Sequence, residues 1–456
     1  MIISFSVSNF RSFNDEVTFS MVASNRFQDH PNHLGNIPDS NAKVLRAGVI
    51  YGANGSGKSN FVRALRYLNR LAIGTRNKDA GTGRNTFLFV EDSSKNSSLD
   101  IQFISDGKTY RYGMEIDDTK IVNEWLVLVN NERESIIFER TTTETGSVSV
   151  DAKELSNENE KICSLINVGG PQNQTFLATI ASTLNVQDYG AHLSSVIRWF
   201  ENSLQFVYPN IEPEYFEREI FEKNGLSEFI NNFLAFSSTG LDRLDVTREE
   251  ITEDKLKTVA AEIYPELSQE KNNYYAYYSN KKLGKAIFVS NENGRHYYMY
   301  SINAVHEHET GKAVSTNLRD ESDGTNRLIR ILPALFDLQN NKNSCVYVID
   351  EIDRSMHPLL VLKFIEFFLS GCAGSSSQLI VTTHDTHILD SDLVRRDEVW
   401  FTEKDEHGAT KMYSLSDFQP RSDLKLGKNY LLGRFGAIPY LGRIDALIHA
   451  EQSKQA

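Results

Sequence analysis

The chain has 456 residues and a formal net charge of −13, and 40% of its residues are hydrophobic. This length allows two or three domains with sizeable cores. The acidic balance argues against a broad nonspecific nucleic-acid surface, although a local basic groove is compatible with it. No apolar stretch is long enough to span a bilayer and the first residues lack the pattern of a secretion signal, so we expect a cytoplasmic protein.

The first 150 residues predict a domain rich in strands. Apolar and polar residues alternate at the start of the chain, which is typical of half-buried strands, and a later turn at Asp106-Gly107 separates two more. The apolar run at 44–51 is followed, at 59–72, by apolar residues at helical spacing. We therefore expect strands at 2–7, 16–22, 44–51, 99–103 and 110–116, and a helix at 59–72.

The rest of the chain divides by pattern into two parts. Residues 151–280 are mostly helical in pattern, with acidic faces, and predict an inserted helical subdomain. Strand patterns return after that and carry the second half of the same domain, at 281–456. Within it we expect strands at 286–290, 296–302, 346–349 and 379–383, and a helix at 325–338.

The most informative motif lies between the predicted strand at 44–51 and the predicted helix at 59–72. Residues 52–59 read Gly-Ala-Asn-Gly-Ser-Gly-Lys-Ser, the full pattern of a phosphate-binding loop. Its glycines let backbone N–H groups surround an anion, its lysine reaches the β- and γ-phosphates, and its last serine can ligate Mg²⁺. The predicted nucleotide contacts are Gly52, Asn54, Gly55, Ser56, Gly57, Lys58, Ser59 and Asn60.

A second motif ends the predicted strand at 346–349. Asp350 and Glu351 follow this strand directly, which is the form of a Walker B motif. We expect Asp350 to hold Mg²⁺ and Glu351 to orient or deprotonate the water that attacks the γ-phosphate of ATP. The alternative is an acidic turn without a catalytic role.

A histidine follows the next apolar strand. His384 ends the run Thr382-Thr383-His384, where an imidazole can donate a hydrogen bond to a γ-phosphate oxygen or to the attacking water. Taken alone, a histidine after a strand is more often structural. Its place after both nucleotide motifs favours a catalytic role.

A further anion site is predicted just before the helix at 325–338. Ser322 and Gly324 lie in the run Ser-Asp-Gly-Thr, next to an exposed helix N-terminus. One nucleotide cannot easily use two separate helix N-termini of the same subunit. We therefore expect this second nest to meet the γ-phosphate of a partner subunit.

The order of these four motifs resembles the ABC-type ATPase heads of the RecF and SMC kind. Within that class, three stretches resemble AAA-annotated ATPases of bacterial abortive-infection systems, the AbiL-like or RloA-like subunits of phage-defence operons. These stretches are 8–13, 350–358 and 433–439, and the resemblance covers roughly 1–140 and 285–440. The resemblance implies an α/β fold: a mixed-sheet P-loop core with an antiparallel β subdomain and an inserted helical subdomain.

The same resemblance implies a head-to-head homodimer, or a higher homo-oligomer, with ATP and Mg²⁺ held between the P-loop of one subunit and Ser322 and Gly324 of the other. The loop 353–357 would then lie at the dimer seam, and Arg11 matches a basic position near the nucleotide in related heads, the alternative being a surface arginine. No glutamine matches the Q-loop of these heads, because Gln102 lies inside an alternating strand. The second protein ligand of the metal stays open.

Two other clusters favour structural interpretations. His306 and His308 alternate with Glu307 and Glu309, which indicates a solvated strand edge rather than a metal site. The tyrosines at 274, 275, 277 and 278 favour packing over base stacking, although Lys281 and Lys282 keep a nucleic-acid interpretation open.

Two hypotheses for function follow. The first is a cytoplasmic ATPase of an anti-phage defence system that senses infection, with a phage-derived trigger possible, and controls a separately encoded, nuclease-like toxic effector through ATP-dependent dimer closure. The second is a RecF- or SMC-like head that clamps DNA in repair or maintenance, which would need a basic groove. A transporter ATPase is disfavoured, because the helical insertion and the opening hairpin do not resemble that group.

Overall fold

The computed structural model describes residues 1–77, 79–90, 95–130, 133–153, 155, 160–210, 216–237, 239–259, 261, 276–280, 285–290, 296–307, 310–340, 344–371, 375–418 and 425–438. The chain divides into two compact units. The first comprises Met1–Phe206, Lys342–Glu351 and Cys372–Ala456, and the second comprises Val207–Asn341 and Ile352–Gly371. The boundaries expected at 150 and 280 from the sequence therefore fall inside units rather than between them.

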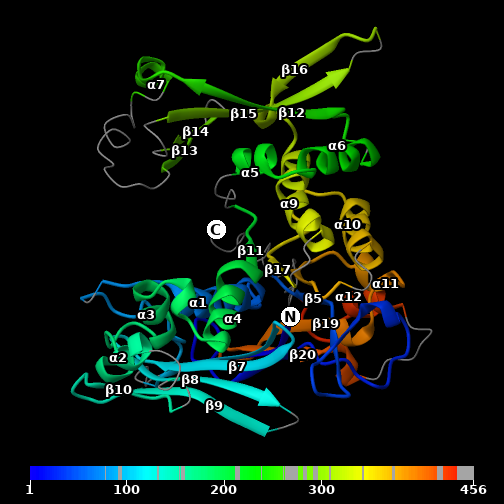
Figure 1. Cartoon of the computed structure of the whole chain (residues 1–456). Coiled ribbons are helices and arrows are strands. Elements are labelled where there is room, and N and C mark those ends of the chain that lie inside the picture. Colours follow the sequence, from blue (N-terminus) through cyan, green and yellow to red (C-terminus); the bar gives the residue numbers. More distant parts are fainter. Residues whose placement is uncertain are drawn as a thin grey trace, which may run out of the picture. The chain divides into compact units, whose positions relative to one another are not determined.

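A seven-stranded antiparallel sheet forms one layer of the first unit (Figure 1). Its strands, in spatial order, are β10 (Val148–Asp151), β9 (Arg133–Thr142), β8 (Ile121–Asn130), β7 (Lys108–Ile116), β6 (Ser97–Ser105), β1 (Ile2–Ser8) and β2 (Val17–Ser20). The two hairpins expected from alternating apolar residues are confirmed, because β1 pairs with β2 and β6 pairs with β7. The alternation buries one face of β1 and one face of β6.

A six-stranded mixed sheet carries the nucleotide motifs. Its spatial order is β11 (Leu204–Val207), β17 (Val346–Ile349), β18 (Gln378–Thr382), β5 (Ala47–Gly52), β19 (Val399–Lys404) and β20 (Thr410–Ser414). The four strands from β17 to β19 are parallel, and β20 is antiparallel to β19. The carboxyl ends of β5, β17 and β18 therefore share one edge of the sheet, where ligands of such sheets bind.

The single strand expected at 44–51 is wrong in one respect, because it is two strands. β4 (Lys43–Leu45) pairs with β3 (Leu34–Asn36) in a separate ladder, and β5 enters the mixed sheet. Arg46 separates them; its side chain is buried and Nη1 donates to the carbonyl oxygen of Asn32 at 3.0 Å. An uninterrupted apolar pattern does not reveal this change of partner.

Helix α1 (Lys58–Ile73) confirms the helix expected after the phosphate-binding loop. Its apolar face is buried, and the Phe61 ring lies 5.6 Å from the ring of Phe5 and 5.1 Å from that of Phe19, both in the antiparallel sheet. Edge-to-face contacts of this kind add to the apolar burial. The unit also contains α2 (Glu160–Val168), α3 (Phe176–Thr183), α4 (Ala191–Arg198), α11 (His387–Asp390) and α12 (Leu426–Leu431).

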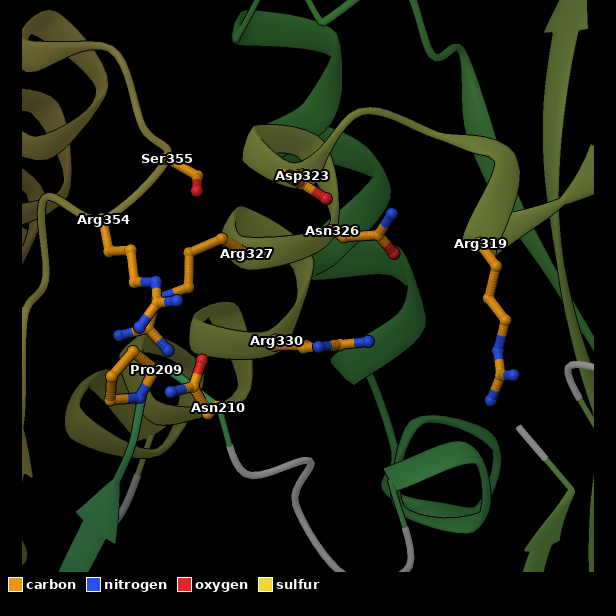
Figure 2. Close-up of a pocket in the computed structure, with 9 residues that line it drawn as sticks. All are labelled: Pro209, Asn210, Arg319, Asp323, Asn326, Arg327, Arg330, Arg354 and Ser355. Atoms are coloured by element: carbon orange, nitrogen blue, oxygen red, sulfur yellow. The ribbon is translucent and has the colours of Figure 1, made fainter. Parts of the chain in front are cut away.

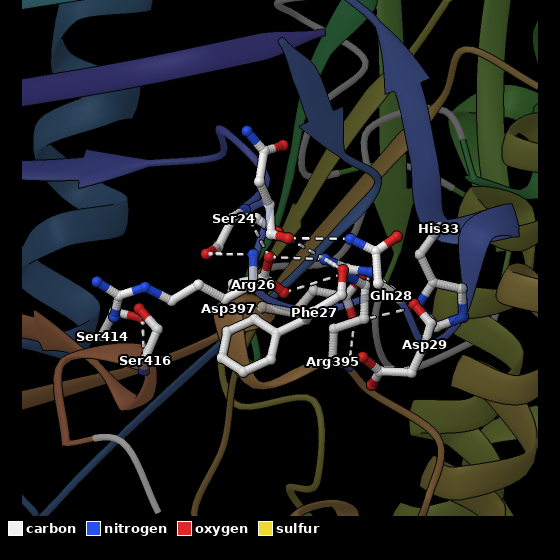
Figure 3. A network of polar contacts seen from close by, with 12 residues as sticks. Ser24, Arg26, Phe27, Gln28, Asp29, His33, Arg395, Asp397, Ser414 and Ser416 are labelled. Atoms are coloured by element: carbon white, nitrogen blue, oxygen red, sulfur yellow. Dashed lines mark hydrogen bonds and ion pairs between the residues drawn. The ribbon is translucent and has the colours of Figure 1, made fainter.

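A buried arginine fixes the loop that follows β2 (Figure 3). Arg395 is fully buried, and its guanidinium donates to the carbonyl oxygens of Asp29 at 2.5 Å and Phe27 at 3.2 Å. The charge is balanced by Asp397, whose Oδ2 lies 2.9 Å from Nη2. This network holds the start of β19 against the N-terminal loop, and so fixes one flank of the mixed sheet.

The second unit contains a five-stranded sheet and helices. The sheet has the order β12 (Arg243–Ile251), β15 (His296–Glu307), β14 (Lys285–Ser290) and β13 (Ala276–Asn280), with β16 (Ala313–Asn317) also paired to β15. The helices are α5 (Phe216–Glu222), α6 (Leu226–Phe236), α7 (Glu253–Val259), α9 (Asp323–Asn340) and α10 (Pro358–Gly371).

The stretch 151–280, expected to be mostly helical, also contains strands. β12 is the clearest case, because it pairs along nine positions with β15, which lies far away in the sequence. Most of its residues are exposed and charged, so the sequence resembles a solvated helix face. The pairing partner is nonlocal, and a local pattern cannot supply it.

The sequence suggested a solvated strand edge at His306, but β15 has a neighbouring strand there. His306 pairs with Val314 of β16, and its Nε2 lies 2.7 Å from Oε1 of Glu321. That carboxylate raises the pKa of His306. Outside the described residues lie His308, Glu309, the tyrosines at 274 and 275, Lys281 and Lys282.

Candidate nucleotide site

The phosphate-binding loop has the backbone that its glycines permit. Gly55 and Gly57 have φ values of 79° and 120°, in the region that favours glycine. A side chain at Gly57 would overlap the side chain of Thr410 on β20, whereas Gly55 faces open space. Asn54 and Gly55 are exposed at the tip of the loop. The loop is therefore packed on one side and open on the other, as a cradle for an anion requires.

Lys58 begins α1 and is directed back over the loop. Its Nζ donates to the carbonyl oxygens of Gly52 at 2.8 Å and Ala53 at 3.2 Å, and the residue is 5% exposed. The ammonium therefore lies beside the loop, where a phosphate chain would meet the backbone N–H groups.

Ser59 and Asp350 meet at the carboxyl ends of β5 and β17. The Ser59 hydroxyl donates to Oδ1 of Asp350 at 3.1 Å. Residues 291 positions apart in the sequence thus form the hydroxyl and carboxylate pair that the two motifs predicted. Oxygen donors of this kind suit Mg²⁺, which keeps several waters and takes one or two protein ligands beside the phosphates. The residues present fit the metal.

Thr382, at the end of β18, holds both acidic residues in place. Its Oγ1 donates to Oδ1 of Asp350 at 2.6 Å and accepts a hydrogen bond from the backbone N–H of Glu351 at 2.8 Å. Thr382 is fully buried. Its role was missed from the sequence, where the run Thr382-Thr383 served only to locate the histidine that follows.

Glu351 has an uncommon backbone conformation. Its φ is 48°, in the left-handed region that side chains other than glycine rarely adopt. Such strain persists where the surrounding structure imposes it, here through the hydrogen bond to Thr382, and it is frequent at functional sites. Glu351 is half-buried, next to the buried Asp350.

His384 lies at the same edge of the sheet and is exposed. The segment after it is anchored to β5, because the hydroxyl of Tyr51 donates to the carbonyl oxygen of Asp385 at 3.1 Å. The backbone N–H of Asp385 also donates to Oγ1 of Thr383 at 2.9 Å. The backbone that carries His384 is therefore anchored next to β5, the strand that leads into the phosphate-binding loop.

A series of hydrogen-bonded hydroxyl groups links the phosphate-binding loop to the strands beside it. Ser56 Oγ and Thr402 Oγ1 are 2.7 Å apart, and Thr410 Oγ1 donates to the carbonyl oxygen of Ser56 at 2.8 Å. Thr410 also reaches Ser12, whose Oγ accepts a hydrogen bond from Asn60 Nδ2 at 2.8 Å. Ser56 and Asn60, predicted as nucleotide contacts, thus also brace the loop against β19, β20 and the N-terminal segment.

Arg11 lies in that N-terminal segment, beside Ser12. Its φ is 52° and its backbone N–H donates to the carbonyl oxygen of Asn85 at 2.7 Å. The guanidinium carbon lies 5.8 Å from the centre of the Phe10 ring. The hydrogen bonds of Ser12 link this segment to α1, so Arg11 belongs to the unit that carries the phosphate-binding loop.

Ser322 and Gly324 lie in the second unit, at the start of α9. Ser322 Oγ accepts a hydrogen bond from the backbone N–H of Thr325 at 3.1 Å, which makes Ser322 the residue that caps the helix. A side chain at Gly324 would come within 2.6 Å of the carbonyl oxygen of Ser355. The predicted signature thus packs against the loop 353–357, in a different unit from Lys58 and Ser59.

A family model matches residues 49–159 and 179–390 and is described as an AAA domain, putative AbiEii toxin, of type IV toxin–antitoxin systems. The chain belongs to this family. The match spans the phosphate-binding loop, both acidic residues and His384, so it confirms the resemblance to AAA-annotated abortive-infection ATPases. No curated protein gives a significant match.

Solved structures with similar folds include SMC heads. An SMC head bound to the C-terminal winged-helix domain of ScpA is 13% identical, with a TM-score of 0.40 over 94% of this chain and 99% of that one. The SMC head domain from Thermotoga maritima is 13% identical, with a TM-score of 0.37 over 91% and 98%. An SMC head from Pyrococcus furiosus bound to the C-terminal domain of ScpA is 13% identical, with a TM-score of 0.36 over 94% and 98%.

Two features are absent from the part of the chain that the structure describes. No helix among the described residues is long and apolar enough to cross a membrane. Within the same residues, no group of three or more His, Cys, Asp or Glu side chains has the geometry of a metal centre.

Proposed function

We propose that this AAA-family ATPase binds and hydrolyses ATP between two copies of the chain. The observation that carries the proposal is the contact between Ser59 and Asp350, 3.1 Å apart at the edge where β5 and β17 end. A hydroxyl at the start of the loop helix and a carboxylate at the end of a neighbouring strand are the two protein ligands that Mg²⁺-ATP needs.

Each residue at this edge would have one role. Lys58 would bind the β- and γ-phosphates, and Ser59 and Asp350 would hold Mg²⁺, which neutralises phosphate charge when bound. Glu351 would accept a proton from the attacking water, and His384 would donate a hydrogen bond to the γ-phosphate. Thr382 keeps Asp350 and Glu351 in position through its two hydrogen bonds.

Hydrolysis would need a second copy, because Ser322 and Gly324 are proposed to bind the γ-phosphate in trans. The support is the exposed, capped N-terminus of α9, whose first N–H groups favour an anion. Closure of the two copies would then depend on ATP, and hydrolysis would release them.

The cellular role proposed is control of a toxic effector in an anti-phage system, in the cytoplasm. The chain would respond to infection and hold or release a separately encoded, nuclease-like partner. Membership of a family associated with toxin–antitoxin systems supports the setting. That family description names a putative toxin, whereas the chemistry proposed for this chain is that of a switch.

Mixing two inactive variants tests the shared site. Lys58→Ala removes one phosphate contact and Ser322→Arg blocks the trans nest, so each alone should hydrolyse ATP slowly. A mixed dimer has one intact site, made from the loop of the Ser322→Arg copy and the nest of the Lys58→Ala copy. Mixing should therefore restore activity; a mixture no more active than its components would contradict the proposal.

The RecF- or SMC-like alternative makes a different prediction. A protein that clamps DNA through phosphate contacts should bind it with ATP and lose affinity steeply as salt rises. Titration of the protein with duplex DNA at several salt concentrations distinguishes the DNA-clamping function from the defence function. Absence of binding, together with co-purification of an effector encoded beside the gene, supports the defence role.

A further inference from the structure

An arginine-rich pocket of about 370 Å³ lies in the second unit, along one side of α9 (Figure 2). We propose that it binds a small polyphosphate anion, at a site separate from the phosphate-binding loop. Its lining comprises Pro209, Asn210, Arg319, Asp323, Asn326, Arg327, Arg330, Arg354 and Ser355.

The charge of the lining points to an anion. The lining contains four arginines and a single carboxylate, that of Asp323, in a chain whose net charge is −13. The composition as a whole therefore does not account for this local excess of positive charge. Guanidinium groups bind phosphate oxygens through paired N–H donors, which makes arginine the residue suited to such ligands.

The arginines come from separate segments, and the fold holds Arg327 in place. Arg327 and Arg330 are one helical turn apart on α9, Arg319 precedes the helix, and Arg354 follows β17. Arg327 is 6% exposed and its Nη1 donates to the carbonyl oxygen of Tyr208 at 3.1 Å. Figure 2 shows Arg327 and Arg354 extending to the same place beside Asn210. Fixed side chains bind an anion with a smaller loss of conformational entropy.

The size of the pocket limits the ligand. About 370 Å³ lies at the small end of the usual range for small-molecule sites. A nucleic-acid duplex would need an extended basic surface rather than a pocket. A free chain of two or three phosphates has the charge to match several arginines.

Inorganic tripolyphosphate is a suitable probe, because it lacks a base and a sugar. Isothermal titration calorimetry with tripolyphosphate, without Mg²⁺, uses the full chain carrying Lys58→Ala. Because this substitution weakens phosphate binding at the loop, the titration measures binding to the pocket. We expect binding to persist in this background and to weaken at least tenfold when Arg330→Ala or Arg319→Ala is added. Arg243→Ala, which removes a surface ion pair with Glu307 in the same unit, should leave it unchanged.

Two results would overturn the assignment: no tripolyphosphate binding by the Lys58→Ala chain, or equal binding with and without the pocket arginines in variants that keep the same circular dichroism spectrum. Neither result depends on ATP hydrolysis. A failure of the pocket is thus distinguishable from a failure of the nucleotide site, which the wild-type chain reports by its rate of ATP hydrolysis.

Discussion

At the scale of single residues, the account depends on a few polar contacts at the edge of the mixed sheet. The contacts of Lys58, Ser59, Asp350 and Thr382 all lie within one unit, so the site is built before any partner is considered. These contacts are strong in effect because the groups are mostly buried, where a lost partner costs more than at the surface.

Lys58→Ala should weaken ATP binding by about 10- to 100-fold, because a charge-assisted hydrogen bond contributes about 1.5 to 3 kcal/mol. Titration with a fluorescent ATP analogue measures the change. Lys43→Ala is a matched control, since Lys43 is exposed and bonds only to an exposed asparagine among the contacts described for its side chain. Tight binding by the Lys58 variant would remove the lysine from the cradle.

Thr382→Val should lower both stability and hydrolysis. Valine keeps the shape but leaves Asp350 Oδ1 and the N–H of Glu351 without this partner, at a cost of about 1 to 3 kcal/mol in the free energy of unfolding. Urea unfolding and steady-state ATPase rates measure the two effects. Thr18→Val, at an exposed hydroxyl pair with Ser6, should change neither; equal behaviour of the two variants would refute the role of Thr382.

Glu124 on β8 predicts a pH dependence of stability. It is fully buried and accepts hydrogen bonds from the backbone N–H groups of Phe176 and Leu177 at 2.6 and 3.2 Å, yet burial raises its pKa above the ordinary 4.5. A folded state that keeps the proton longer loses stability as pH rises above about 4.5 and through the raised pKa.

The stability advantage of the wild type over Glu124→Gln should therefore shrink as pH rises across that window, because glutamine does not titrate. Denaturant unfolding of both proteins at several pH values isolates this group from the others. A stability advantage that grows with pH would show that the hydrogen bonds to Glu124 lower its pKa by more than burial raises it.

At the scale of secondary-structure elements, the predicted signature is proposed to act through the start of α9. Ser322→Arg places a bulky cation where the helix N-terminus is proposed to meet a phosphate. ATP binding by the separate chain should stay within about twofold, because the phosphate-binding loop is in another unit, while hydrolysis should fall by about 100-fold or more. Unchanged turnover in a steady-state assay would remove Ser322 from the trans site.

The elements also show what the sequence could predict. The phosphate-binding loop and its helix, the acidic pair after β17 and both N-terminal hairpins follow from local patterns, and the structure has each of them. The strand β12 was missed because its partner β15 is distant in sequence and its own residues are mostly charged. Local periodicity reports burial, and β12 is largely exposed.

The support of the site was missed for a related reason. Thr382, Thr410 and Ser12 are ordinary hydroxyl residues, and only the pairing of distant strands brings them to the loop. The arginine pocket likewise collects residues from separate segments, none of which forms a basic run. A motif records the residues that touch a ligand, whereas the residues that position them depend on the fold.

At the scale of the whole molecule, the central proposal is that ATP joins two copies. Glu351→Gln should slow hydrolysis by about 10²- to 10⁴-fold, the usual contribution of a general base, without removing a ligand of the metal. If two copies share each ATP, the slow variant should accumulate as the joined form.

Light scattering of the Glu351→Gln chain with and without Mg²⁺-ATP tests this most directly. The account predicts one copy without nucleotide and a dimer, or a larger assembly, with ATP, reversed by adding Ser322→Arg. A protein whose mass ignores ATP while the wild type hydrolyses it as a single copy would contradict the shared site.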